Sequence, residues 1–256
     1  MTTLSLQPSS HLLNKVPEVT LFFWIIKMMS TTVGETAADF LIFNVHLGLT
    51  VTSIIMGVLL LISLSIQLRC QRYIPWIYWL TVVLISIFGT LITDNLVDHF
   101  GVPLAVATAV FSIALIATFI SWYASERTLS IHTIYTKKRE LFYWAAILFT
   151  FALGTAAGDL VAEGLKLGYL NSALMFGAVI GSIAIVYYVF KRHAITAFWM
   201  AYILTRPFGA SWGDYLSQAV NSGGLGLGTT GTSVLFLVVI LGLVTYLSIQ
   251  NEKATS

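Results

Sequence analysis

The stretch FWIIKMMSTTVGETAAD at residues 23–39 decides the fold, because its pattern returns three more times along the chain. Each copy has an aromatic residue, a tryptophan, nine residues, a glycine, four residues and an aspartate. The other copies occupy residues 78–94, 143–159 and 198–214. Four matches at the same offsets indicate an internal repeat, which sets the architecture. The motif glycines and aspartates are Gly34, Gly89, Gly154, Gly209, Asp39, Asp94, Asp159 and Asp214.

The composition points to a membrane protein. Of the 256 residues, 57% are apolar and only 9% are charged, and the mean hydropathy is +0.88. An ordinary soluble domain has about 25% charged residues. A chain with so few charges cannot solvate a soluble surface, so we expect an integral membrane protein. The single cysteine, Cys70, excludes an internal disulfide and a multi-cysteine metal site.

Eight apolar segments are long enough to cross a bilayer, which takes about 20 residues. They lie at 19–43, 49–68, 75–100, 103–124, 141–167, 170–190, 194–219 and 228–249. We therefore predict an all-α integral membrane protein with eight transmembrane helices in four parallel two-helix repeats. The same 120-residue step separates Gly34 from Gly154 and Gly89 from Gly209, which predicts two pseudo-symmetric halves.

The charge distribution predicts the orientation and the domain limits. Lysine and arginine gather in one set of loops, and the opposite set offers only Lys166, so we expect both termini to be cytoplasmic. The motif tryptophans, near the cytoplasmic ends of their helices, are expected to form an interfacial aromatic belt. The predicted segments are a cytoplasmic N-terminal segment (1–18), a first membrane half (19–126), a basic cytoplasmic linker (127–140) and a second membrane half (141–250).

Seven of the eleven acidic residues lie in the motif regions. They are Glu35, Asp39, Asp94, Asp98, Asp159, Glu163 and Asp214. Residues four apart share a helix face, so Thr90 and Thr155 line up with the aspartates that follow them. Repeat symmetry would bring these stripes together in one acidic, hydroxyl-lined interior.

So many carboxylates in an apolar setting require compensation. Only two cations, Lys27 and Arg206, lie within the spans. The remaining acids must therefore be protonated, exposed to water or bound to a cation. We interpret Arg206 either as a structural ion pair with a motif aspartate or as a gate or substrate-anion contact. Lys27 is open to the same readings, with a preference for snorkelling to the cytoplasmic face.

The motif glycines have two interpretations. Small residues let helices approach closely, or a break in the helix would expose backbone carbonyls as ligands. The Arg206-Pro207 pair favours a break in the seventh helix. His46 and His99, near the outer mouth, are candidates for a transition-metal site or for plain solvated loop residues.

Four strings resemble one family of multi-pass membrane proteins. They are KVPEVT at 15–20, TTVGET at 31–36, TLSIH at 128–132 and LTRPFGAS at 204–211. The family is known as an uncharacterised bacterial membrane-anchored protein with a repeat of unknown function. The resemblance covers nearly the whole chain and implies a multi-pass protein of the bacterial inner (cytoplasmic) membrane. It implies no substrate.

The leading hypothesis is a transporter or channel-like carrier for a cation. Oxygen ligands suit a proton, Na⁺ or a hard divalent ion such as Mn²⁺ or Mg²⁺. Ion-binding roles fall to Glu35, Asp39, Asp94, Asp159 and Asp214, with Thr90 and Thr155 as neutral ligands and Asp98 and Glu163 attracting ions to the mouth. Arg206 and Lys27 would gate the path or pair with the acids. A divalent cation is the only bound cofactor expected, and none is required.

Three alternatives stay open. One is a proton-coupled carrier of a small organic solute, with Arg206 contacting a substrate carboxylate. Another is a membrane scaffold in which the acids form a structural polar network. The third is an intramembrane hydrolase, because Gly158-Asp159 and Gly213-Asp214 are Gly-Asp pairs of the kind found in intramembrane aspartyl proteases. In every case the partners are the lipid bilayer and the ion or solute, without nucleic acid; the sequence leaves a homo-oligomer open.

Overall fold

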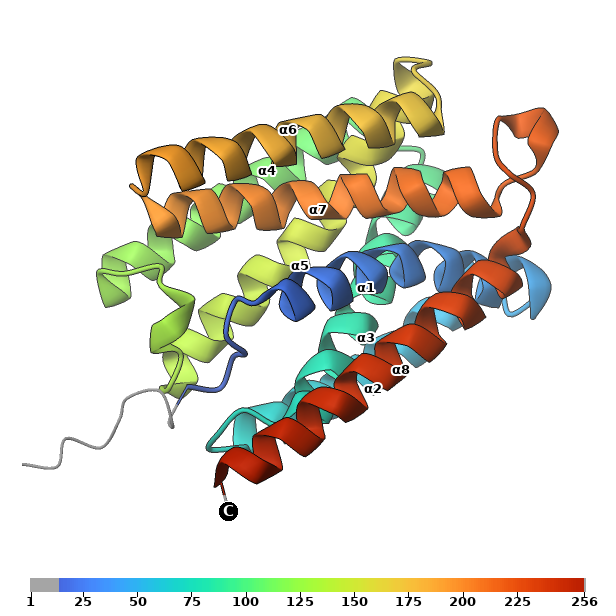
Figure 1. The fold of residues 1–256 in the computed structure, drawn as a ribbon. Helices are drawn as coiled ribbons and strands as arrows, with labels where there is room; N and C mark the ends of the chain where they lie inside the picture. Colours follow the sequence, from blue (N-terminus) through green and yellow to red (C-terminus); the bar gives the residue numbers. More distant parts are fainter. Residues whose placement is uncertain (1–13, 256) are drawn as a thin grey trace, which may run out of the picture.

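The computed structural model describes residues 14–255, and in this range its regular structure is entirely helical (Figure 1). Most of the predicted N-terminal segment 1–18, and both chain ends, lie outside the described residues. The α-helices are α1 (Leu21–Asp39), α2 (Leu49–Arg69), α3 (Pro75–Asp94), α4 (Leu104–Glu126), α5 (Lys137–Asp159), α6 (Tyr169–Phe190), α7 (Ala194–Ser217) and α8 (Gly228–Thr255).

Local signals set the helix starts. The Thr20 hydroxyl accepts a hydrogen bond from the backbone N–H of Phe23 and so caps α1, and Thr136 caps α5 in the same way. Pro75 stands in the first turn of α3, where its missing N–H costs nothing. At the other end, α4 stops at Arg127, whose backbone is left-handed.

Three motif aspartates are each the last α-helical residue before a π-helical turn. The turns are η2 (Phe40–Asn44), η3 (Asn95–His99) and η5 (Leu160–Gly164), which follow α1, α3 and α5. The fourth repeat differs, because α7 continues to Ser217 and is followed by the 3-10 turn η6 (Val220–Ser222). A π-helical turn is rare and is often found at functional sites. The sequence analysis predicted long helices here and did not foresee the change of winding.

The four motif helices form a ring. Helix α1 packs on α3, α3 on α5, α5 on α7, and α7 returns to α1. Figure 1 shows these four helices in the middle of the molecule.

The motif glycines explain how closely these helices approach. Each glycine meets the residue that stands three positions before the motif glycine of the next repeat. The contacts are Gly34 with Ser86, Gly89 with Phe151, Gly154 with Arg206 and Gly209 with Thr31. A Cβ atom on any of these glycines would collide with its partner. The close packing expected of these small residues is therefore observed at all four positions.

The even-numbered helices surround the ring, and each covers the motif helix of the following repeat. Helix α2 packs on α3, α4 on α5, α6 on α7, and α8 closes the cycle on α1. In Figure 1, α4 and α6 lie on one side of the molecule, and α2 and α8 lie on the other. Each motif helix is thus covered mainly by the even-numbered helix of the preceding repeat, and α8 also touches α7 of its own repeat.

The outer surface is apolar. Leu61, Ile113, Ile185 and Val238, one from each even-numbered helix, have exposed fractions between 62% and 67%. Contiguous exposed aliphatic surface of this kind is suited to lipid. Within the described residues, six helices are long and apolar enough to span a membrane: α2, α3, α4, α5, α6 and α8. The chain is therefore a helical membrane protein. Helices α1 and α7, which carry the buried Lys27, Glu35, Arg206 and Asp214, also lie in the ring.

Two sequence interpretations are wrong. Helix α7 runs without a break through Pro207, so the expected interruption is absent. The motif tryptophans do not form a lipid-facing belt, because Trp79, Trp144 and Trp199 are buried with exposed fractions of 5% or less. They pack with neighbouring aromatic rings inside the ring of helices, at the end where the motif helices begin, for example Tyr78 on Trp144.

A buried ion pair ties the chain together at the same end. Lys15 Nζ lies 2.6 Å from Glu140 Oε2, and Gln67 Nε2 donates to the other Glu140 oxygen at 3.1 Å. This network joins the N-terminal segment, α2 and the first turn of α5. The predicted linker 127–140 therefore ends inside α5 and is fixed to the helices around it.

Candidate functional site

Arg206 of α7 lies at the centre of the ring and is fully buried. Its Nη2 atom donates to Glu35 Oε2 of α1 at 2.9 Å. The ion pair that the sequence analysis expected between Arg206 and a motif aspartate is thus made with Glu35 instead. The reason is geometric: Glu35 follows the motif glycine directly, and Arg206 reaches that level from the neighbouring helix.

The same guanidinium gathers the equivalent position of three repeats. Glu35, Thr90 and Thr155 each follow their motif glycine, and Arg206 Nη2 donates to all three. The distance to Thr155 Oγ1 is 2.6 Å. Thr90 Oγ1 also donates to Glu35 Oε2 at 3.3 Å. The fourth equivalent residue, Ala210, has no polar group, so its helix contributes the arginine in place of a ligand.

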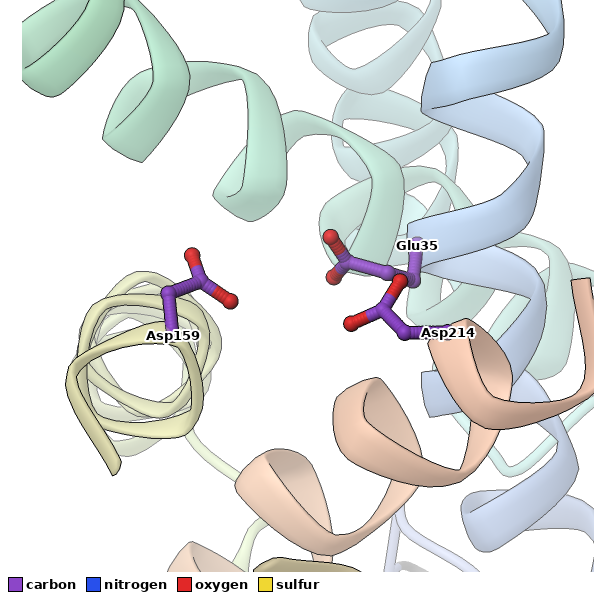
Figure 2. A group of neighbouring side chains, drawn as sticks. All are labelled: Glu35, Asp159 and Asp214. Atoms are coloured by element: carbon purple, nitrogen blue, oxygen red, sulfur yellow. The ribbon is translucent and has the colours of Figure 1, made fainter. Parts of the chain in front are cut away.

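Three carboxylates converge beside this network. Figure 2 shows Glu35 of α1, Asp159 of α5 and Asp214 of α7 directed toward one another, and one carboxylate oxygen of each lies within 4.8 Å of the others. Glu35 and Asp214 are buried, with exposed fractions of 7% and 8%, and Asp159 is half-buried. Oxygen atoms at this separation can hold a hard cation or share protons.

The other two motif aspartates are not part of this close group. Asp39 and Asp94 are half-buried at the ends of α1 and α3. Of the acids that the sequence analysis expected in one interior, the structure therefore brings Glu35, Asp159 and Asp214 within 4.8 Å of one another.

The remaining predicted residues lie nearer the surface. Asp98 and Glu163 are exposed, and Glu163 accepts a hydrogen bond from the Tyr169 hydroxyl at 2.9 Å. His46 and His99 are also exposed, and the structure does not bring them into the carboxylate cluster. The acids at this end thus form a gradient from exposed to buried.

The snorkelling predicted for Lys27 is wrong. Its side chain is fully buried, and its Nζ atom lies 4.2 Å from the centroid of the Phe151 ring and 4.4 Å from that of Tyr202. In the part of the chain that the structure describes, Nζ has no hydrogen-bond partner. Lys27 therefore does not neutralise the acids, and Arg206 is the cation that reaches them directly.

Sequence reasoning missed the aromatic partners of these cations. The usable signal was the column three residues before the motif glycine, which reads Thr31, Ser86, Phe151 and Arg206. The first two repeats have a small hydroxyl residue at this position, the third has a phenylalanine and the fourth an arginine. The symmetry of the repeats is therefore broken at the position that supplies Arg206.

Comparison with known proteins identifies the repeat. The family model described as "Repeat of Unknown Function (DUF347)" matches residues 22–73, 77–128, 142–193 and 197–252. Each matched segment covers most of one motif helix and most or all of the even-numbered helix that follows it. No curated protein and no solved structure matches the chain.

Proposed function

The chain belongs to the family of the Repeat of Unknown Function (DUF347), and from the carboxylates that its four repeats gather we propose that it is a membrane carrier for a cation. The observation that carries the proposal is the convergence of Glu35, Asp159 and Asp214 within 4.8 Å. Arg206 offsets the charge of Glu35 alone, so a proton, Na⁺ or a hard divalent ion such as Mn²⁺ or Mg²⁺ would balance the others.

In this proposal all eight α-helices cross the bacterial inner membrane, as two pseudo-symmetric halves with both termini in the cytoplasm. Helices α1 and α7 are included because their charged residues are buried inside the ring. The exposed Asp98 and Glu163 then mark the outer mouth, and they raise the local concentration of cations there.

Arg206 is the gate of this carrier. A cation that binds to Glu35 must compete with the guanidinium, because Arg206 Nη2 already holds Glu35 Oε2. On the side of Arg206 away from the acids, the Tyr78 and Tyr143 hydroxyl groups bond to each other between the neighbouring helices α3 and α5. In this proposal the aromatic end is the closed side of the carrier.

Transport of Mn²⁺ into proteoliposomes tests the proposal. We expect the Asp159→Asn/Asp214→Asn double variant to lose uptake by at least about tenfold, which corresponds to a loss of about 1.4 kcal/mol of ion binding, because two of the three carboxylates are removed. Asp98→Asn/Glu163→Gln removes the same charge from the exposed end and should have a smaller effect. Unchanged uptake in the first variant would exclude the carboxylate site, and parallel runs with Mg²⁺ and Na⁺ assign the ion.

One observation favours a second function, an intramembrane hydrolase. The two aspartates that follow glycines, Asp159 and Asp214, are brought within 4.8 Å of each other on α5 and α7. Two facing aspartates that share a proton form an acid–base pair. Cleavage of a co-expressed membrane substrate that is lost in Asp159→Asn would support this function. The nearby Glu35 and Arg206, which such a pair does not need, make the carrier the better-supported proposal.

The organic-solute alternative has less support. Nη2 of Arg206 is held by Glu35, Thr90 and Thr155, and Nη1 donates to the Thr31 carbonyl, which leaves Nε as the nitrogen without a partner among the described residues. A two-point contact with a substrate carboxylate would therefore have to displace at least one of these groups.

A further inference from the structure

Lys27 lies in the half of the helix ring that contains the motif tryptophans, away from the carboxylate cluster. It is fully buried, and its Nζ atom has no acceptor among the described residues. The two surfaces that it faces are the rings of Phe151 and Tyr202. Aromatic faces attract a cation, but the attraction is on the order of 2 kcal/mol and does not replace the hydration of a buried ammonium. The site therefore disfavours a permanently charged lysine.

The nearby guanidinium of Arg206 further disfavours the charged form of Lys27. Arg206 Cζ lies 5.6 Å from the centroid of the same Phe151 ring that Lys27 contacts. Arg206 has a carboxylate partner in Glu35, and Lys27 has none in the described part of the chain. Of the two side chains only lysine can give up its proton under physiological conditions, because a guanidinium stays charged.

The repeat symmetry is broken at these residues. Lys27 and Tyr202 occupy the same position, seven residues before the motif glycine, where the other repeats have Val82 and Ile147. Phe151 and Arg206 share the position one turn further on. Lys27, Arg206, Phe151 and Tyr202 thus form one cluster that breaks the repeat symmetry. The other contacts between the motif helices are equivalent from repeat to repeat.

The other titratable groups around this half of the ring are phenols and, at its end, the Lys15–Glu140 ion pair. Tyr202 of α7 has a buried hydroxyl without a partner among the described residues, and the hydroxyls of Tyr78 (α3) and Tyr143 (α5) bond to each other. From α8, Tyr246 packs on Phe22. Lys15 is paired with Glu140, so Arg206 is the charged group that shares a contact with Lys27.

From this geometry we propose that Lys27 is a proton-binding site, separate from the carboxylate cluster. Lys27 holds its proton less well when Arg206 is not paired with Glu35. Its role in coupling rests on the proposed cation carriage. A cation at Glu35 releases Arg206 from its partner, and the guanidinium then acts on Lys27 across Phe151. Lys27 becomes a neutral amine and its proton passes to water, so one proton leaves for each cation that binds. The exchange is electroneutral for a monovalent cation and moves one net positive charge inward for Mn²⁺.

The proton site is tested without any transported ion. The full-length protein, purified in detergent, is titrated between about pH 5 and about pH 9, a range in which an ordinary exposed lysine stays charged. Wild type should take up about one more proton per chain than Lys27→Met, and Lys27→Gln should behave like Lys27→Met. The exposed Lys166 supplies the matched control, since Lys166→Met should titrate like wild type. Identical curves for wild type and both Lys27 variants would overturn the proposal.

Coupling is tested in proteoliposomes with Mn²⁺. Lys27→Met should keep Mn²⁺ entry down its own gradient and lose the acceleration that an imposed pH gradient gives to wild type. Full acceleration in Lys27→Met would overturn the coupling role. If Asp159→Asn/Asp214→Asn retained full uptake, the proposed carboxylate site would fail, while the titration would still decide the fate of the Lys27 site.

Discussion

Gly209 of α7 packs against Thr31 of α1, and this contact closes the ring that the other three motif glycines begin. It joins the last repeat to the first, far along the chain. Thr32, the next residue, donates its hydroxyl to the Gly209 carbonyl at 3.2 Å, so the contact is also hydrogen-bonded. Closure at this point places Arg206 beside Glu35, because Arg206 stands one turn before Gly209 and Glu35 one turn after Thr31.

We predict that Gly209→Ala destabilises the protein. A Cβ atom would collide with the Thr31 side chain, and overpacking of this kind costs about 1–3 kcal/mol. The better helix propensity of alanine would offset about 1 kcal/mol of that cost. Thermal unfolding in detergent, followed by circular dichroism, should give a lower midpoint than wild type.

Gly242→Ala in α8 is the matched control. Nothing lies within 4 Å of its Cβ position, so this variant should be as stable as wild type or slightly more stable. Equal midpoints for Gly209→Ala and Gly242→Ala would mean that the ring does not close as described.

The Glu35–Arg206 pair is predicted to be strongly coupled. Each single variant, Glu35→Gln or Arg206→Gln, leaves one buried charge without its partner, which costs about 3–5 kcal/mol. The double variant removes both charges, so its loss of stability should be smaller than the sum of the two. The interaction free energy between the two side chains is expected to be about 1–3 kcal/mol. It is obtained from a double-mutant cycle of unfolding free energies, derived from the unfolding midpoints.

A pair with one exposed member gives the comparison for this cycle. Lys138 lies 3.7 Å from Glu126 and is 65% exposed. Lys138→Gln should leave the unfolding midpoint unchanged, because solvent screens such a pair. Strict additivity of Glu35→Gln and Arg206→Gln would show that the two side chains do not act as a unit.

The repeat, the helix pairs and the gathering of acids could be predicted from the sequence, because they depend on spacing along one chain. The contacts between side chains of different helices could not be predicted from it. Periodicity places Glu35 and Asp39 on one face of α1, but it does not say that Arg206 of α7 arrives at the level of Glu35. Lys27 was misjudged for the same reason: the rings that cover it belong to α5 and α7, and a snorkelling lysine has the same sequence signature.

The winding of the helix ends was also beyond the sequence. The π-helical turns after Asp39, Asp94 and Asp159 change the winding of the helix without a proline or glycine at a shared position. The cover of each motif helix by the preceding repeat is likewise a tertiary choice. Loop lengths permit α2 to pack on α1 or on α3, and only side-chain fit decides between them.

The membrane orientation leads to the last prediction, for which the chain supplies its own probe. Cys70 is the single cysteine and follows α2 at the end of the molecule that carries Arg69 and Arg72. If that end is cytoplasmic, a membrane-impermeant maleimide should label Cys70 in inside-out vesicles and not in intact cells. Burial raises the pKa of the Cys70 thiol, so labelling should be slow near neutral pH and accelerate as the pH rises and the thiolate forms.

The opposite end needs an introduced probe. Leu165, which follows α5 and is 68% exposed, is suitable in a Cys70→Ser background as Leu165→Cys. This variant should be labelled in intact cells and protected in inside-out vesicles. Labelling of Cys70 from outside the cell would reverse the orientation and turn the mouth formed by Asp98 and Glu163 toward the cytoplasm. Because the acids and the aromatic end lie on opposite sides of Arg206, that result would also reverse the side from which a cation first meets Glu35.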